Sequence, residues 1–252
     1  MKLVSLLVTL LLGALLLTAA ADFPSWGDPH SPASLHVSDY YIENSLEQTA
    51  VPNFVTSILA DYRGYDTMFE TTVIFCAGLT VLTLLRRSHR KEKKVVTPRP
   101  NREDQDLILT SAARMIAPMM QIFALYVVAH GHHSPGGGFQ GGVILGASFI
   151  LLALSYDLQT VLGRLKERVA LIMSGIGVAI YAGIGAGCLL LGGNFLDYGV
   201  WSKVLGVFGV TPVTARSHGM LGVEIGVAIT VMYIMFSLYA DLSSGGEMDE
   251  GL

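Results

Sequence analysis

The segment GMLGVEIGVAITVMYIMFSLYA (residues 219–240) decides the fold class, because its only charged side chain is that of Glu224. A helix that rises about 1.5 Å per residue needs roughly 20 apolar residues to cross the hydrocarbon core of a bilayer. Five further stretches are similarly apolar, at residues 3–21, 68–85, 109–129, 139–156 and 169–191. We therefore expect an all-α membrane protein with six transmembrane helices in a polytopic bundle.

The composition of the 252 residues excludes several function classes. Hydrophobic residues make up 52% of the chain and charged residues only 14%, whereas about 25% are charged in soluble domains. A soluble globular enzyme is thus excluded, and a net charge of -4 argues against a nucleic-acid partner. Cys76 and Cys188 lie in apolar stretches without CxxC spacing, which argues against a disulfide framework or a zinc site.

The distribution of lysine and arginine predicts the orientation. Basic residues gather between the second and third spans, at 86–102, and again between the fourth and fifth. Because basic loops stay in the cytoplasm, we expect both termini and residues 86–106 to be cytoplasmic and residues 22–67 to be outside, in the cell's inner (plasma) membrane. The first span, with Lys2 and three alanines at 19–21, also has features of a cleavable signal peptide. We expect a retained helix and leave cleavage open.

The basic stretch contains Pro98 and Pro100 and divides the chain into modules. Residues 1–88 form a two-helix module, residues 89–106 a cytoplasmic linker, and residues 107–252 a four-helix module. No internal repeat of useful length is present, so we do not expect an inverted-repeat transporter within this one chain.

Small and polar residues predict how the helices pack. Arg114, Pro118 and Gln121 lie on one face of the third span, and that face is unsuited to lipid. Pro118 should also kink this helix. Small residues at every fourth position of the fifth span predict a helix–helix interface; they are Gly175, Ala179, Gly183 and Gly187.

Ionisable groups within the spans are candidates for an ion or proton route, because each is costly in hydrocarbon unless it is paired or hydrated. Glu70, Glu224 and His130 fall near the outer ends of their spans, and Arg114 falls near an inner end. Asp66 precedes Glu70 in a run with Asp61 and Arg63. These charges could form a funnel on the water side or be ordinary interfacial charges, and we favour the second interpretation for Asp61 and Arg63. For each carboxylate the alternative is a structural role, held by backbone or by a lysine of a neighbouring subunit.

The connection between the third and fourth spans, at residues 130–142, is rich in glycine and histidine. It predicts a tight reversal, because proline fixes φ and glycine adopts conformations that other residues avoid. The reversal is built from Pro135, Gly136, Gly137, Gly138, Phe139, Gly141 and Gly142. A G-x-G-x-x-G match within it is rejected as a dinucleotide site because membrane spans flank it. Three histidines without a carboxylate at ligand spacing are weak evidence for zinc, so we expect no metal and no cofactor.

This hairpin carries a family resemblance. AHG (129–131) followed by SPGGGFQGG (134–142) resembles the signature of the B-type protein of the Mrp-type multisubunit Na+/H+ antiporters, the MnhB family. The similarity continues through LSYD (154–157) and GVEIGV (222–227), and it covers residues 105–242.

The first module resembles a different component of these antiporters. DYRGYDTMFETTV (61–73) is similar to the last two helices of their large A-type protein, a piece that is a separate small subunit in membrane-bound hydrogenases. The resemblance spans about residues 1–88. The chain is therefore expected to be a fusion of two neighbouring subunits.

The resemblance implies a membrane subunit without redox centre or catalytic residues. It would lie beside small subunits and a large proton-carrying subunit of a cation/proton antiporter complex, where Asp66, Glu70 and Glu224 would exchange Na+ or H+. A component of an energy-converting hydrogenase or ferredoxin-linked respiratory complex is the alternative, with a redox module as partner. Two other hypotheses are a structural spacer and an intramembrane metalloenzyme that uses the histidine loop; the latter is disfavoured because H-E-x-x-H is missing.

Overall fold

The computed structural model describes residues 2–89 and 107–244, and within these ranges the regular elements are all helical. Almost all of the predicted linker, residues 89–106, lies outside the described residues. The chain divides into two compact units, residues 1–44 and residues 45–252, which are described separately.

The first unit contains α1 (Lys2–Ala20) and the short π-helix η1 (Ala33–Ser38), and α2 (Asp39–Thr49) begins in it. Leucine and other apolar residues occur on every face of α1, and its described side chains are exposed or nearly so. A helix that is apolar all round is typical of a membrane span.

Six helices are long and apolar enough to cross a membrane, which confirms the prediction of six spans. Besides α1 they are α4 (Gly64–His89), α5 (Leu107–Ala129), α6 (Gly138–Ser155), α8 (Glu167–Leu190) and α10 (Pro212–Ser244).

Short helical elements connect these spans in the second unit. Residues 54–62 form α3 (Phe54–Ser57) and η2 (Ile58–Tyr62) just before α4. The later connections contain α7 (Leu158–Leu162), η4 (Tyr198–Trp201), α9 (Ser202–Leu205) and η5 (Gly206–Phe208).

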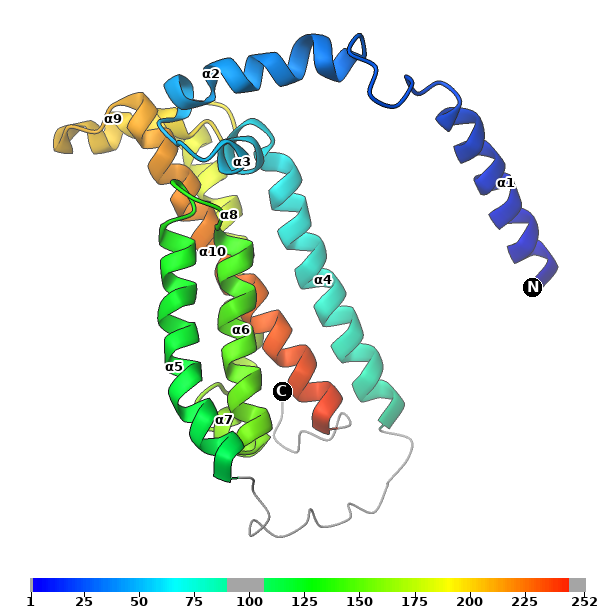
Figure 1. The fold of residues 1–252 in the computed structure, drawn as a ribbon, viewed down its shortest axis with the longest axis vertical. Coiled ribbons are helices and arrows are strands. Elements are labelled where there is room, and N and C mark those ends of the chain that lie inside the picture. The colour runs from blue at the N-terminus through cyan, green and yellow to red at the C-terminus, as the bar shows by residue number, and fades with distance from the viewer. Residues whose placement is uncertain (1, 90–106, 245–252) are drawn as a thin grey trace. The chain divides into compact units, whose positions relative to one another are not determined.

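Helix α10 is the central element of the second unit and packs against α4, α6 and α8 (Figure 1). Helix α5 lies beside α6, on the side away from α4. Because α10 has neighbours on several sides, more of its residues are buried than in the other spans. A polar group on α10 is therefore held within the bundle.

Glycines bring α6 close to α10. Gly138 and Gly142 lie one turn apart on the face of α6 that meets α10. A Cβ atom on Gly138 would lie 2.0 Å from the carbonyl oxygen of Glu224, and one on Gly142 would lie 2.7 Å from that of Ala228. The two backbones can approach this closely only because neither glycine has a side chain.

A second glycine contact joins α8 to α10, on a different face of α8 from the one predicted. A Cβ on Gly177 would lie 2.4 Å from the carbonyl oxygen of Gly226, and the hydroxyl of Thr230 donates to the carbonyl of Ser174 at 2.9 Å. In the predicted stripe, a Cβ on Gly183 would meet no atom within 4 Å. The contact between α8 and α10 therefore uses Gly177. Two members of the predicted stripe face other partners, since a Cβ on Gly175 would lie 3.6 Å from the ring of Phe75 on α4 and one on Gly187 would lie 2.4 Å from the ring of Trp201.

Helix α10 begins at Pro212, earlier than the predicted residue 219. The hydroxyl of Thr211 accepts from the backbone N–H of Thr214 at 3.3 Å, and a proline at the first helical position needs no N–H partner. The prediction counted apolar residues and so stopped at the polar run Arg216–His218. These polar side chains belong to the same helix as Glu224.

Candidate functional site

The glycine hairpin between α5 and α6 closes over Glu224. Residues 130–137 make the reversal, and the N–H of Gly137 donates to the carbonyl of Val127 at 3.1 Å. Gly137 has φ of +122°, which favours glycine, and a Cβ there would lie 2.8 Å from Oε1 of Glu224. The hairpin is thus both a tight turn, as predicted, and a cover fitted to one carboxyl group.

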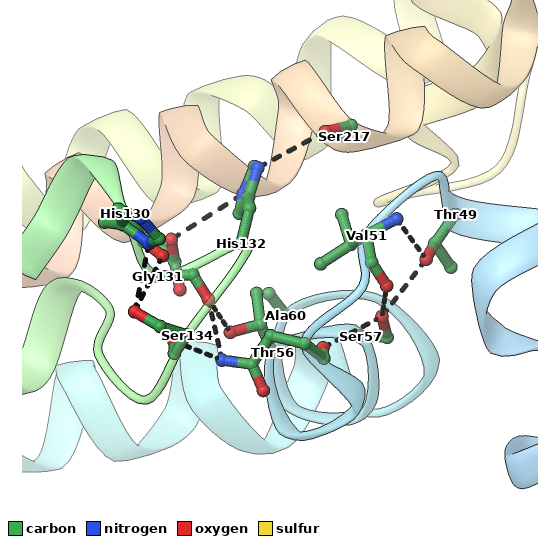
Figure 2. Close-up of polar contacts among 12 residues, drawn as sticks. Thr49, Val51, Thr56, Ser57, Ala60, His130, Gly131, His132, Ser134 and Ser217 are labelled. Atoms are coloured by element: carbon green, nitrogen blue, oxygen red, sulfur yellow. Dashed lines mark hydrogen bonds and ion pairs between the residues drawn. The ribbon is translucent and has the colours of Figure 1, made fainter.

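Glu224 faces an imidazole that the hairpin supplies. Nε2 of His132 lies 3.8 Å from Oε2 of Glu224, and the two residues are each only 8% exposed. Both atoms are buried and have no hydrogen-bond partner among the described residues. On its other side, Nδ1 of His132 lies 3.3 Å from the hydroxyl of Ser217 (Figure 2). The arrangement places a carboxyl group and an imidazole where a proton can pass between them after a small approach.

The segment before α4 holds the hairpin in place through side chains of residues 53 and 56. The side-chain amide of Asn53 donates to the carbonyls of Gly131 at 2.7 Å and Ser134 at 2.8 Å. The hydroxyl of Thr56 donates to the same Gly131 carbonyl at 2.8 Å, as Figure 2 shows. The position of His132 therefore depends on residues of both predicted modules.

Burial lowers the pKa of His132 below its usual 6.5, and the nearby His133 and His218 lower it further. Its imidazole is thus mainly neutral at neutral pH, so the contact with Glu224 is not a standing ion pair. A neutral imidazole beside a carboxyl group is suited to accept a proton and return it.

We expect His132 to make folding stability depend on pH. Because its folded pKa lies below 6.5, its contribution is complete above that pH and is lost as the pH falls from 6.5 to the folded pKa. The slope of this loss stays below about 1.4 kcal/mol per pH unit, which is the limit for a single titrating group. Thermal unfolding of the full-length protein at a series of pH values measures it. The fall should disappear in His132→Gln and persist in His36→Gln, an exposed control; equal curves for all three proteins would refute the assignment.

His130, the histidine predicted from the sequence, has a different environment. Its Nδ1 lies 3.0 Å from the hydroxyl of Ser134. Its ring contacts that of Tyr126 in a tilted arrangement, with centroids 4.8 Å apart, and meets that of His133 edge-on. These contacts stabilise the hairpin. The structure brings His132 to Glu224, and sequence position alone gave no reason to prefer it over its neighbours.

The remaining predicted residues lie apart from this pair. Asp66 is exposed and forms an ion pair with Arg63, whose Nε donates to it at 2.6 Å. Glu70 lies on the exposed side of α4 beside Phe69. Arg114 lies towards the opposite end of α5 from the hairpin and donates to the hydroxyl of Tyr156 at 2.9 Å.

Asp61 is more than the interfacial charge that the sequence indicated. It is buried, and Arg216 on α10 donates to its Oδ2 from both Nε and Nη2 at 2.8 Å. Nearby, the hydroxyls of Tyr198 and Tyr181 donate to the carbonyls of Ala60 and Gly64. The sequence did not indicate this ion pair because Arg216 had been placed outside its helix. The Thr211–Pro212 start signal would have placed it there.

We expect Asp61→Asn to destabilise the fold by about 2–3 kcal/mol, since removing one partner leaves an unpaired cation. The cost is below the about 3–5 kcal/mol of a fully buried pair because the side chain of Arg216 is 28% exposed. Chemical denaturation of the protein in detergent would measure it. Arg63→Gln, which breaks an exposed pair, should cost less than about 1 kcal/mol; equal costs would contradict the buried role of Asp61.

Metal binding would require a cluster of ligand side chains. Within residues 2–89 and 107–244, no three His, Cys, Asp or Glu side chains group closely enough to hold a metal ion.

Comparison with known proteins places the chain in a family. Residues 108–237 match the model described as a domain related to the MnhB subunit of Na+/H+ antiporter. The chain belongs to the MnhB family. The B-type protein of a Na(+)/H(+) antiporter from Bacillus subtilis (strain 168) is 32% identical over 130 residues, which cover 50% of this chain and 90% of that protein. The hairpin, His132 and Glu224 all lie within the matched region of this MnhB-family chain.

The first module has its own match, to the model of MbhE, a component of MBH, over residues 10–102. A probable K(+)/H(+) antiporter protein of the fused A/B type from Rhizobium meliloti (strain 1021) is 28% identical over 205 residues, 74% of this chain and 20% of that protein. The MnhB-family chain is thus a fusion of the terminal segment of the A-type protein with the B-type protein, as predicted.

A solved structure of a respiratory complex also matches both modules. A chain of the membrane-bound sulfane sulfur reductase, an archaeal respiratory membrane complex, is 29% identical with a TM-score of 0.55, covering 92% of this chain and 97% of that one. The MnhB-family chain is a multi-pass membrane protein whose relatives occur in multisubunit membrane complexes.

Proposed function

We propose that this chain is a transport subunit, without catalytic activity of its own, in a multisubunit cation/proton antiporter, and that Glu224 and His132 exchange protons on its translocation route. The observation that carries the proposal is the 3.8 Å approach of two buried atoms that lack hydrogen-bond partners among the described residues. Burying two ionisable groups in a membrane bundle is energetically costly. Such groups are therefore expected mainly where a function uses them. Membership of the MnhB family supplies the class of transport.

The step that the pair performs is a reversible proton transfer. Protonated Glu224 passes its proton to Nε2 of His132 and becomes a carboxylate, and the imidazolium later returns it or releases it on the hairpin side. Ser217, 3.3 Å from Nδ1, orients the ring. The carboxylate left behind is a hard oxygen ligand of the kind that alkali and alkaline-earth cations accept.

Glu70 is proposed to act at a boundary with a neighbouring subunit. Its side chain is exposed on α4 in the isolated chain, beside the apolar Phe69 and Val73. A carboxylate on an apolar helix face calls for a polar or hydrated partner. In the complex we place the large proton-carrying subunit or a small subunit on this face, with Asp66 at its entrance.

We expect Glu70→Gln to abolish ion exchange by the reconstituted complex without preventing assembly, because glutamine keeps the shape but neither ionises nor releases a proton. Dye-based measurement of a collapsing pH gradient in vesicles would report it. Glu47→Gln, an exposed carboxylate on α2, is the matched control and should transport normally. An intact Glu70→Gln complex with the normal rate would make Glu70 structural.

The orientation is also part of the proposal. We place both termini and residues 86–106 in the cytoplasm and residues 22–67 outside the inner membrane, on the strength of the basic connections. The hairpin and Glu224 then lie towards the outer side, and Arg114 lies towards the inner side.

A redox-driven complex is the second candidate, and one observation favours it. The sulfane sulfur reductase chain is matched over 97% of its length and so contains little besides the two modules, whereas the match covers only 20% of the fused A/B antiporter protein. In that setting this chain would still carry ions, while a separate module supplied the electrons. Iron–sulfur absorbance in the complex purified through this chain would support the redox-driven assignment, and a complex free of it would support the antiporter.

A further inference from the structure

A cavity of about 340 Å³ lies at the end of the bundle away from the glycine hairpin, between α5, α6 and the α7 turn. Its lining combines two guanidinium groups, two hydroxyls, one amide and an apolar wall. Six of the lining residues are Arg114, Gln121, Leu152, Tyr156, Thr160 and Arg164. The polar face predicted on the third span is thus turned into this cavity, which explains why it need not contact lipid tails.

The described residues that line the cavity include two arginines and no carboxylate. Among residues 2–89 and 107–244, no carboxylate lies within ion-pair distance of Arg114 or Arg164. Arg114 uses Nε for the 2.9 Å bond to Tyr156, which fixes its guanidinium and leaves the terminal N–H groups for another acceptor. The nearby carboxylate of Asp157 accepts from the N–H and the hydroxyl of Thr160, at 2.6 and 2.9 Å.

Two arginines that line one cavity are suited to a phosphate group. The planar guanidinium donates paired hydrogen bonds that match phosphate oxygens, and the side-chain amide of Gln121 lies in the same lining. Basic pockets between transmembrane helices are a recognised setting for anionic lipid headgroups. Phosphate is therefore the chemistry that this lining recognises.

The surroundings favour a lipid over a soluble phosphate. Next to the cavity, α5 exposes large apolar side chains: Met115 is 71% exposed, Met119 67% and Ile122 71%. Acyl chains can lie along this surface while the headgroup reaches the arginines. Lys166 and Arg168 are exposed in the adjacent connection and its following helix, so positive charge gathers at this end of the bundle.

We propose that this cavity binds the phosphate of an anionic phospholipid headgroup. The site is distinct from the Glu224–His132 pair, and its existence does not depend on the proposed transport function.

Lipid binding to the purified complex tests the proposal. The complex is placed in phosphatidylcholine nanodiscs, and phosphatidylglycerol is titrated while retained lipid is counted by native mass spectrometry. Since a charge-assisted hydrogen bond to a phosphate strengthens binding about tenfold or more, Arg114→Gln with Arg164→Gln should weaken retention about 100-fold. Arg164→Gln alone, on an exposed turn, should weaken it about tenfold and covers the case in which the double variant does not fold. Arg168→Gln is the matched control, because it removes a nearby charge that does not line the cavity.

The outcomes separate the lipid from its competitors. Loss in the Arg114 and Arg164 variants, with Arg168→Gln unchanged, supports the site. Equal retention in all variants, or an equal loss in Arg168→Gln, overturns it. Displacement of phosphatidylglycerol by millimolar inorganic phosphate would make a soluble anion the ligand and would overturn the lipid assignment.

Discussion

Complexes carrying Glu224→Gln should assemble normally yet exchange ions at least about 100-fold more slowly than the wild type, the scale on which a positioned proton-transfer group acts. Glutamine matches glutamate in shape, so it still fits beneath Gly137 and keeps the backbone contact with Gly138. It has no proton to exchange with His132 and no charge to offer a cation. Proton flux into vesicles that contain the reconstituted complex would be compared at equal complex content.

Two further variants serve as comparisons for Glu224→Gln. Glu224→Asp retains an ionisable group but shortens the side chain, so partial activity is expected from it. Glu47→Gln removes a carboxylate from the exposed face of α2 and should leave the rate unchanged. A Glu224→Gln complex with normal flux would show that the buried carboxyl group serves structure alone.

The second large effect is expected from Gly138→Ala, which should destabilise the bundle by about 3 kcal/mol, the upper part of the range for overpacked interiors. The added methyl carbon would lie 2.0 Å from the carbonyl oxygen of Glu224 and 2.7 Å from its carbonyl carbon. Both are backbone atoms and cannot rotate away, so α6 and α10 must separate. The yield of assembled complex and its thermal unfolding would measure the loss.

The same substitution at an open site provides its control. Gly183→Ala lies on α8, where a Cβ meets no atom within 4 Å, and it should leave the chain's own stability unchanged or slightly raised, since alanine favours helix. If Gly138→Ala behaved like Gly183→Ala, the close packing of α6 on α10 would be incorrect.

Sequence patterns predicted those features that depend on one segment at a time. The six spans follow from length and apolar composition, and the hairpin follows from Pro135 and its glycines. The shared face of Arg114, Pro118 and Gln121 follows from helical spacing, and all three line the cavity.

Contacts between distant segments could not be predicted in the same way. Glu224 and His132 are separated by many residues, and only folding brings them to 3.8 Å. Several histidines of the hairpin were equivalent in sequence, so the packing of the reversal against α10 decides which one faces the carboxyl group. Similarly, α8 has small residues on two faces, and the partner residue Gly226 selects Gly177.

The position of the last helix was a different kind of error, because the signal was present. Thr211 followed by Pro212 is a typical helix start, yet the polar residues after it concealed the helix from an apolar count. Placing the start there puts Ser217 and Glu224 seven residues apart on one face, which is the face that meets His132.

The most direct test of the central claim is an infrared difference spectrum of the intact complex between acidic and alkaline pH. The account predicts a protonated-carboxyl band that appears at low pH in the wild type and is missing from Glu224→Gln, while the Glu47→Gln control keeps it. Identical carboxyl bands in the wild type and Glu224→Gln would contradict proton exchange at this site.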